Sequence, residues 1–187
     1  MKNNNKIAFL DLETTGLYAG THEIIEAAVI INDSIFHVKV KPKNLHLASE
    51  EALQINGYSS KGWADAIDSK YLAHKLAELL EGYTIIGHNP RFDIEFIECL
   101  FEEHQIPIGI NRRAIDTITL SYVYLRPLGL KSMSLDSIRE FLGWTVRAQH
   151  NALDDAFDVK RLYDLLTTKK YYFWYISHYA NKLLGRK

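Results

Sequence analysis

The chain has 187 residues, 47% hydrophobic and 24% charged, which is typical of a single globular domain. Its 22 basic and 23 acidic residues give a formal net charge of −1, which excludes a protein that binds nucleic acid through bulk positive charge. The single cysteine, Cys99, excludes an internal disulfide and fits a reducing compartment. Because the sequence shows no secretory signal and no membrane-spanning apolar run, we expect a soluble cytoplasmic protein.

The first half of the chain predicts a sheet that contains a hairpin. Three apolar segments have strand character, and the second and third are joined by a tight Asn32–Asp33 turn. A helical repeat of apolar residues follows, with Gly82 as its stop signal, and then another short apolar strand. These elements cover residues 6–12, 24–31 and 34–40, then a helix at 71–80 and a strand at 83–87.

The second half predicts mainly helices. Asn89 and Pro90 are typical of an N-cap and a first helical position, and they predict a helix that ends near residue 104. Asp116, Ser134 and Asn151 predict the N-caps of three further helices, the last of which ends near residue 166. Strands followed by alternating strands and helices favour an α/β domain with a mixed sheet.

The C-terminal part differs in composition from the rest. From Lys160 onward the chain has seven basic residues and one acidic residue, Asp164, with aromatic residues between them. We therefore divide the chain into a domain at residues 1–168 and a basic aromatic tail at 169–187. We expect the tail to be a packed helix; stacking on nucleic acid and docking of a partner are the alternatives. The aromatic residues are Tyr171, Tyr172, Phe173, Trp174, Tyr175 and Tyr179.

Carboxylates stand at the ends of several predicted elements. Asp11 and Glu13 end the first strand, and alternation along the strand directs both to one face, where a cation would offset their repulsion. Asp93 falls in the first turn of the helix after Asn89, a position at which an acidic residue also complements the helix dipole. Taken separately, each of these features is also explained by an ordinary structural role.

The third acidic segment begins with a histidine. If Asn151 is the N-cap, Asp154 can bond back to the cap, and Asp155 stays available for a site just after His150. Three acidic segments at element ends can converge at the strand ends of one sheet. Their hard oxygen ligands select Mg²⁺ or Mn²⁺, and two such ions suit attack of water on a phosphodiester, with an imidazole as the base.

Three motifs together resemble a known family. FLDLETTGL, the H-N-x-x-F-D of residues 88–93 and the H-x-x-x-x-D of residues 150–155 are similar to the three motifs of the DEDDh 3′–5′ exonucleases. This family includes the proofreading epsilon subunit of bacterial replicative DNA polymerase and ribonuclease T. Further similarity extends the resemblance to about residues 6–167. It implies a ribonuclease H-like α/β fold with a mixed five-stranded sheet flanked by helices.

The resemblance also implies roles for particular residues. Two divalent ions, Mg²⁺ or Mn²⁺, would be held by four carboxylates, and His150 would be the general base. The segment Thr14–Leu17 would surround the terminal nucleotide together with His88 and Asn89, although a capping role for Asn89 competes with substrate binding. The four metal ligands are Asp11, Glu13, Asp93 and Asp155, and the segment consists of Thr14, Thr15, Gly16 and Leu17.

The favoured function is a metal-dependent 3′–5′ exonuclease that releases nucleoside 5′-monophosphates from single-stranded ends, with DNA preferred. RNA is the alternative substrate, because recognition of a 2′-hydroxyl depends on loop geometry. A non-catalytic nucleic-acid-binding or polymerase-associated module and a two-metal phosphatase for small molecules are further alternatives. A DNA polymerase subunit is a possible partner, and the sequence does not indicate an oligomeric state.

Overall fold

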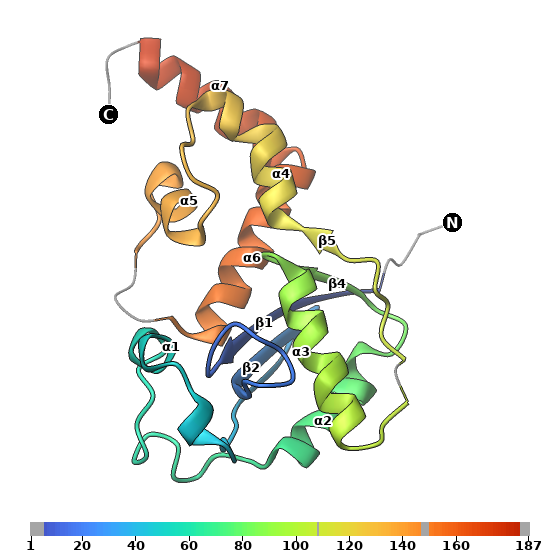
Figure 1. Cartoon of the computed structure of the whole chain (residues 1–187). Coiled ribbons are helices and arrows are strands. Elements are labelled where there is room, and N and C mark those ends of the chain that lie inside the picture. Colours follow the sequence, from blue (N-terminus) through green and yellow to red (C-terminus); the bar gives the residue numbers. More distant parts are fainter. Residues whose placement is uncertain (1–5, 108, 147–149, 184–187) are drawn as a thin grey trace.

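A computed structural model describes residues 6–107, 109–146 and 150–183. Its centre is a five-stranded sheet in the order β3-β2-β1-β4-β5 (Figure 1). The β1–β2 and β2–β3 pairs are antiparallel, whereas β1–β4 and β4–β5 are parallel, so the sheet is mixed as predicted. The strands are β1 Ile7–Thr14, β2 Ile24–Ile31, β3 Ser34–Lys39, β4 Thr84–Gly87 and β5 Ile115–Asp116.

Helices cover both faces of the sheet (Figure 1). Apolar residues of α2 and α3 form the larger core cluster on one face, and α6 packs on the other. A third cluster joins α4, α5 and α7 to the C-terminal half of α6. The helices are α1 Glu50–Ile55, α2 Ser69–Leu80, α3 Pro90–Glu103, α4 Thr117–Tyr124, α5 Leu135–Leu142, α6 Ala152–Thr167 and α7 Lys170–Leu183, with 3₁₀ turns at Leu45–Leu47 and Arg126–Leu128.

Side chains of β1 alternate between the two cores. Leu10 and Leu12 belong to the cluster beneath α2 and α3, as predicted for Leu12, whereas Phe9 belongs to the cluster beneath α6. Alternation therefore directs Asp11 and Glu13 to the α6 face. The fold thus aims both carboxylates of the first motif at the helix that carries the third.

Several boundaries differ from those predicted. Strand β1 continues to Thr14, because Glu13 and Thr14 still pair with β2. The two-residue strand β5 was not predicted, since two residues are too short for a periodic signal.

The predicted N-caps of three helices are confirmed. The side chains of Asp116 and Asn151 cap α4 and α6, accepting from Ile118 N at 2.9 Å and from Asp154 N at 3.1 Å. Ser134 likewise caps α5, accepting from Ser137 N at 3.3 Å.

The predicted capping role of the Asn89 side chain is wrong. Asn89 precedes α3, but its backbone is left-handed, with φ 69°, and its side chain makes no cap hydrogen bond. Its N–H instead donates to Asp116 Oδ1 at 3.1 Å. The Asn89 amide is therefore not occupied by the capping bond that competes with substrate binding.

The C-terminal helix α7 packs through part of its aromatic surface. Tyr171 donates to Tyr124 O at 3.3 Å, and Trp174 lies beside Phe141 with ring centroids 6.2 Å apart. Tyr172 and Phe173 are exposed. The N-terminal residues 1–5 and the tail residues 184–187, with two of the predicted tail's basic residues, lie outside the described part of the chain. The division at residue 168 stays a prediction.

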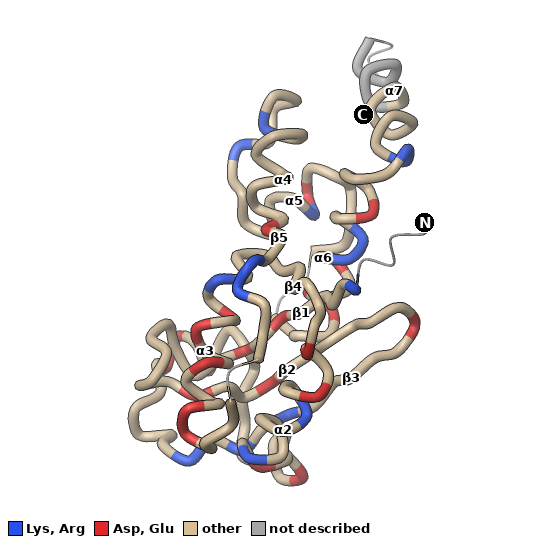
Figure 2. Tube along the Cα trace, turned by 90° about the vertical axis from the view of Figure 1, so that its right-hand side faces the viewer, with Lys and Arg blue, Asp and Glu red and all other residues tan. Residues whose placement is uncertain are grey.

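Lys and Arg occur in several separate parts of the molecule. Figure 2 shows them along α6, at the start of α7 and in the connection between α3 and β5. None of the helices in the described ranges is long and apolar enough to cross a bilayer.

Candidate active site

The carboxylates of β1 lie in an acidic, poorly solvated environment. Glu13 is 7% exposed and stands opposite Glu26 of β2, which is 1% exposed. Burial raises the pKa of Glu13 to about 8, and the charge of Asp155 adds to this effect. Burial also raises the pKa of Asp11 well above its usual range, helped by the charges of Asp93, Asp155 and Glu13.

Asp93 comes to this site from the first turn of α3. A Cβ at Gly87 would lie 3.0 Å from Pro90 Cβ, so the absent side chain at Gly87 allows α3 to begin close to the end of β4. Asp93 is buried, and burial raises its pKa well above its usual range despite backbone hydrogen bonds, including one from Leu12. The third predicted ligand therefore lies beside β1.

The start of α6 supplies Asp155 and His150. Asp155 is buried, while His150 is partly exposed just outside the helix, and its N–H donates to Ile55 O at 3.2 Å. His150 Nδ1 lies 3.4 Å from Asp155 Oδ2. The hydrogen bond to Asp155 raises the pKa of His150, although burial opposes it. Burial would raise the pKa of Asp155, but His150 and Arg139 together lower it below its usual value.

Three of the five predicted catalytic residues form one close group. Glu13, His150 and Asp155 each offer a ligand atom, and these atoms lie within 4.8 Å of one another. Asp11 and Asp93 lie outside this group, but Asp93 and Asp155 are near enough to raise the pKa of Asp11. Carboxylate oxygens beside an imidazole suit a hard divalent cation, which would also relieve the repulsion among the buried carboxylates. The residues present therefore fit a divalent metal ion.

Two charged residues near the site were not predicted as part of it. Glu26 Oε1 accepts from His37 Nε2 at 2.5 Å and from Asn151 Nδ2 at 2.9 Å, and so ties the sheet to the cap of α6. The sequence contained a signal for Glu26, because Glu26 is the only charged residue within the otherwise apolar strand β2. Arg139 of α5 bonds Asp155 directly, and a single arginine in an amphipathic helix gives no such signal.

The predicted substrate-binding segment forms the loop after β1. Thr15 Oγ1 accepts from Glu23 N at 2.9 Å, and Thr14 Oγ1 donates to Gly16 O at 2.7 Å, so both hydroxyls hold the loop in shape. Leu17, by contrast, is 74% exposed. In Figure 1 this blue loop lies beside α1 and the start of α6, and Ser49 N donates to Thr15 O at 2.8 Å.

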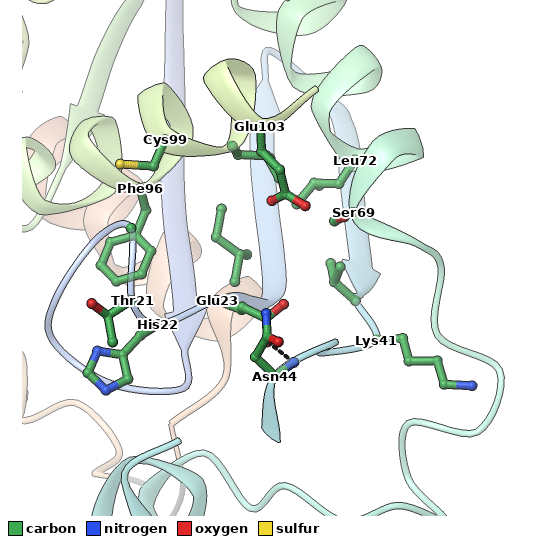
Figure 3. A pocket seen from close by; sticks show the side chains of 14 residues that line it. Thr21, His22, Glu23, Lys41, Asn44, Ser69, Leu72, Phe96, Cys99 and Glu103 are labelled. Atoms are coloured by element: carbon green, nitrogen blue, oxygen red, sulfur yellow. Dashed lines mark hydrogen bonds between the residues drawn. The ribbon is translucent and has the colours of Figure 1, made fainter. Parts of the chain in front are cut away.

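Gly16 is required by the fold of this loop. A Cβ at Gly16 would lie 2.4 Å from the His22 ring, which stacks on Tyr18 and accepts from Tyr18 N at 3.0 Å. Behind the loop is a cavity of about 260 Å³, shown in Figure 3, in which Phe96 lies near His22 and Thr21. This cavity is lined by α2 and α3, whereas the site carboxylates of β1 face α6.

The ring of His88 contacts residues of the domain itself. His88 Nδ1 lies 2.9 Å from Thr117 Oγ1, and Nε2 lies 2.7 Å from Met133 O. Burial lowers the pKa of His88. Both ring nitrogens thus join β4 to α4 and to the segment before α5, and a role of His88 in substrate binding stays a prediction.

Comparison with known proteins agrees with this architecture. Residues 8–163 match the model of the RNase_T exonuclease family. The chain belongs to this family. The match confirms the family resemblance that the three sequence motifs indicated.

Relatives of this chain include longer proteins that are named as DNA polymerase III or its epsilon subunit. It is 32% identical over 158 residues to a PolC-type DNA polymerase III of Thermotoga petrophila, covering 82% of this chain and 11% of that protein. It is 30% identical over 162 residues to the DNA polymerase III subunit epsilon of Pasteurella multocida, covering 79% and 62%. The chain thus spans only part of the length of these relatives.

Solved structures share the fold of this chain. E. coli exonuclease I, crystallised with a dT13 oligonucleotide, superposes with a TM-score of 0.74 at 19% identity. The superposition covers 92% of this chain and 43% of exonuclease I. The predicted ribonuclease H-like arrangement of a mixed sheet flanked by helices is confirmed.

The raised pKa of Glu13 predicts how stability depends on pH without metal. The Glu13 carboxyl has a pKa of about 8 in the folded chain and an ordinary value of 4.5, which we take for the unfolded chain. Its contribution to the free energy of unfolding is therefore fully present below pH 4.5 and is lost as the pH rises through 8. We expect the Tm in EDTA to fall by at least about 4 °C between about pH 5 and 9, since about 1 kcal/mol corresponds to about 2–4 °C at this size.

Differential scanning calorimetry across this pH range measures the effect. Glu13→Gln is the matched variant, because the amide keeps the shape of the side chain and cannot ionise. It should reduce the dependence without abolishing it, since the raised pKa values of Asp11 and Asp93 act in the same direction. A wild-type Tm that rises steadily over the same range would contradict the prediction.

Proposed function

We propose that this chain is a metal-dependent 3′–5′ exonuclease that hydrolyses phosphodiester bonds at single-stranded 3′ ends and releases nucleoside 5′-monophosphates, with DNA preferred. The observation that carries the proposal is the convergence of Glu13, His150 and Asp155 beside Asp11 and Asp93. Membership in the exonuclease family supports it, as does the likeness in fold to exonuclease I, whose crystals contain a DNA oligonucleotide.

In this proposal two divalent ions, Mg²⁺ or Mn²⁺, would be held by four carboxylates. The four carboxylates are those of Asp11, Glu13, Asp93 and Asp155. When bound, such ions stabilise charge on the phosphate and on the leaving oxygen and make water a better nucleophile at neutral pH. The chain contributes preformed carboxylates, whose mutual repulsion in a buried setting favours an incoming cation.

His150 is the proposed general base. Its Nδ1 faces Asp155 Oδ2 at 3.4 Å, an arrangement in which the carboxylate orients the ring and stabilises the imidazolium. The imidazole accepts a proton from the attacking water, the resulting hydroxide adds to phosphorus, and the bond to the 3′ oxygen of the next nucleotide breaks. That oxygen then takes up a proton from solvent or from the imidazolium.

The terminal nucleotide is proposed to bind along the loop Thr14–Leu17 and near Asn89. Exposed Leu17 offers an apolar surface on which a base can stack, a contact that favours unpaired strands. The Asn89 side chain, which does not cap α3, offers an amide for hydrogen bonding near the acidic site. Because the net charge is −1, we assign the main attraction for phosphate to the bound ions.

A time course on a 5′-labelled single-stranded DNA oligonucleotide and its RNA twin tests the function. Both strands are incubated with Mg²⁺, with Mn²⁺ and with EDTA. We expect a ladder that shortens from the 3′ end only when metal is present, and we expect DNA to be shortened faster than RNA. The released product should co-migrate with nucleoside 5′-monophosphates. A faster RNA reaction would replace the proposed substrate, and retention of both strands without cleavage in either metal would favour a binding module.

We also propose that the domain works beside a DNA polymerase. The relatives named as polymerase III epsilon and PolC-type polymerases support this partner. The helix α7 lies beyond the family match and exposes Tyr172, Phe173 and Ile176. Purified polymerase catalytic subunit should co-elute with the full chain on gel filtration, and separate elution would contradict the partnership.

A further inference from the structure

Arg139 is a fully buried cation next to the candidate site. It lies near the end of α5, and its side chain is 2% exposed. Each of the three guanidinium nitrogens donates a hydrogen bond to an aspartate. Nε donates to Asp158 Oδ2 at 2.9 Å, Nη1 to Asp136 Oδ1 at 2.6 Å, and Nη2 to Asp155 Oδ1. A buried charge with this many partners is fixed in place, and loss of one partner is costly.

These three aspartates come from two helices. Asp136 is on α5 itself, whereas Asp155 and Asp158 lie three residues apart on one face of α6. The guanidinium therefore ties α5 to the first two turns of α6. A planar fork can bond three carboxylates at defined angles, which the single ammonium group of lysine cannot do.

The contact with Arg139 divides the two oxygens of Asp155 between different partners. Oδ1 accepts from Arg139, and Oδ2 lies 3.4 Å from His150 Nδ1. A carboxylate held at one oxygen cannot rotate about its Cβ–Cγ bond without breaking that hydrogen bond. The other oxygen, Oδ2, is consequently directed toward His150, and Asp155 forms the close group of candidate ligands together with Glu13 and His150.

We propose that Arg139 is a positioning residue, which holds Asp155 so that Oδ2 is presented both to a divalent ion and to His150. This inference rests on the proposed function. Hydrogen-bond partners behind a metal ligand typically contribute 10–100-fold to metal affinity or activity. The positive charge of Arg139 acts in the opposite direction, because it repels an incoming cation, so the sign of the change in affinity separates positioning from charge.

Mn²⁺ binding to the full chain, followed by electron paramagnetic resonance at fixed pH, tests the proposal. Arg139→Gln removes the fork and the charge, and Arg139→Lys keeps only the charge. We expect both variants to bind Mn²⁺ about 10–100-fold more weakly and to lose a similar factor in kcat, with little change in the KM for the oligonucleotide. The matched control is Arg112→Gln, which breaks an exposed pair with Glu98 and should leave Mn²⁺ affinity unchanged.

Two results would overturn the proposal. A lower Tm with unchanged Mn²⁺ affinity would make Arg139 merely structural, and tighter Mn²⁺ binding would show that its charge outweighs positioning. If Arg139→Gln does not fold, Asp158→Asn loosens the same guanidinium and should weaken Mn²⁺ binding by several-fold, with unchanged binding counting against the role. A wild-type chain without exonuclease activity would contradict the proposed function, while the Mn²⁺ titration would still decide the role of Arg139.

Discussion

An Asp11→Asn variant is expected to lose at least about 10³-fold in turnover and to melt no lower than wild type in EDTA. Removing a ligand weakens electrostatic stabilisation of the reaction by several kcal/mol, and about 1.4 kcal/mol corresponds to tenfold in rate. Stability behaves differently. Burial and the neighbouring acids raise the pKa of Asp11 well above its usual range, so the charged form is disfavoured in the folded chain and a neutral amide of the same shape is tolerated.

Steady-state cleavage of the labelled DNA strand and calorimetry in EDTA measure these two effects. Asp65→Asn is a suitable control, because Asp65 is exposed and lies outside the site, and it should change neither quantity. Full turnover by the Asp11 variant would refute the metal-ligand role. A much lower Tm without metal would show instead that the Asp11 carboxylate supports the fold.

The His150→Gln variant is expected to lose about 10²–10⁴-fold in kcat, the usual contribution of a general base. It should also lose the acid side of the pH profile. In the wild type the base must be neutral, so the rate should climb with pH as the imidazolium loses its proton; in the metal-free chain the hydrogen bond to Asp155 raises the pKa of His150. Bound metal would lower this pKa.

The same variant separates two chemical roles for His150. The imidazole lies close enough to Glu13 and Asp155 to be a metal ligand itself. If His150 acts only as a base, the His150→Gln variant should keep its Mn²⁺ affinity. If His150 is a metal ligand, the variant should bind Mn²⁺ more weakly. Exposed His46 provides the control, because His46→Gln should leave the rate and its pH profile unchanged. A variant that keeps the wild-type acid limb would disprove the base assignment.

Local patterns in the sequence predicted much of the site. Alternation along β1 correctly placed Leu12 in the core and put Asp11 and Glu13 on the opposite face. The cap at Asn151 correctly fixed the start of α6 and so the location of Asp155. These features depend on a few neighbouring residues, which is why the sequence alone is sufficient to predict them.

Features that depend on distant contacts could not be predicted in this way. Asn89 has the residue type of an N-cap, but its N–H bonds Asp116 and its backbone is left-handed. Arg139 looks like a solvent-exposed helix residue until α6 brings Asp155 and Asp158 to it. In both cases tertiary partners override the local preference of the residue.

The pairing of β1 with β4 has a consequence for folding. Ile7 lies beside Thr84 in this parallel pair, so a long loop must close before the two strands meet, and α6 must then dock on the opposite face. Contacts of such high sequence separation slow folding, because the entropy cost of closing the loop must be met before they form. We therefore expect the acidic groups to approach one another late in folding. In that case a divalent ion should lengthen the lifetime of the native state by slowing unfolding, with little effect on the rate at which the chain folds.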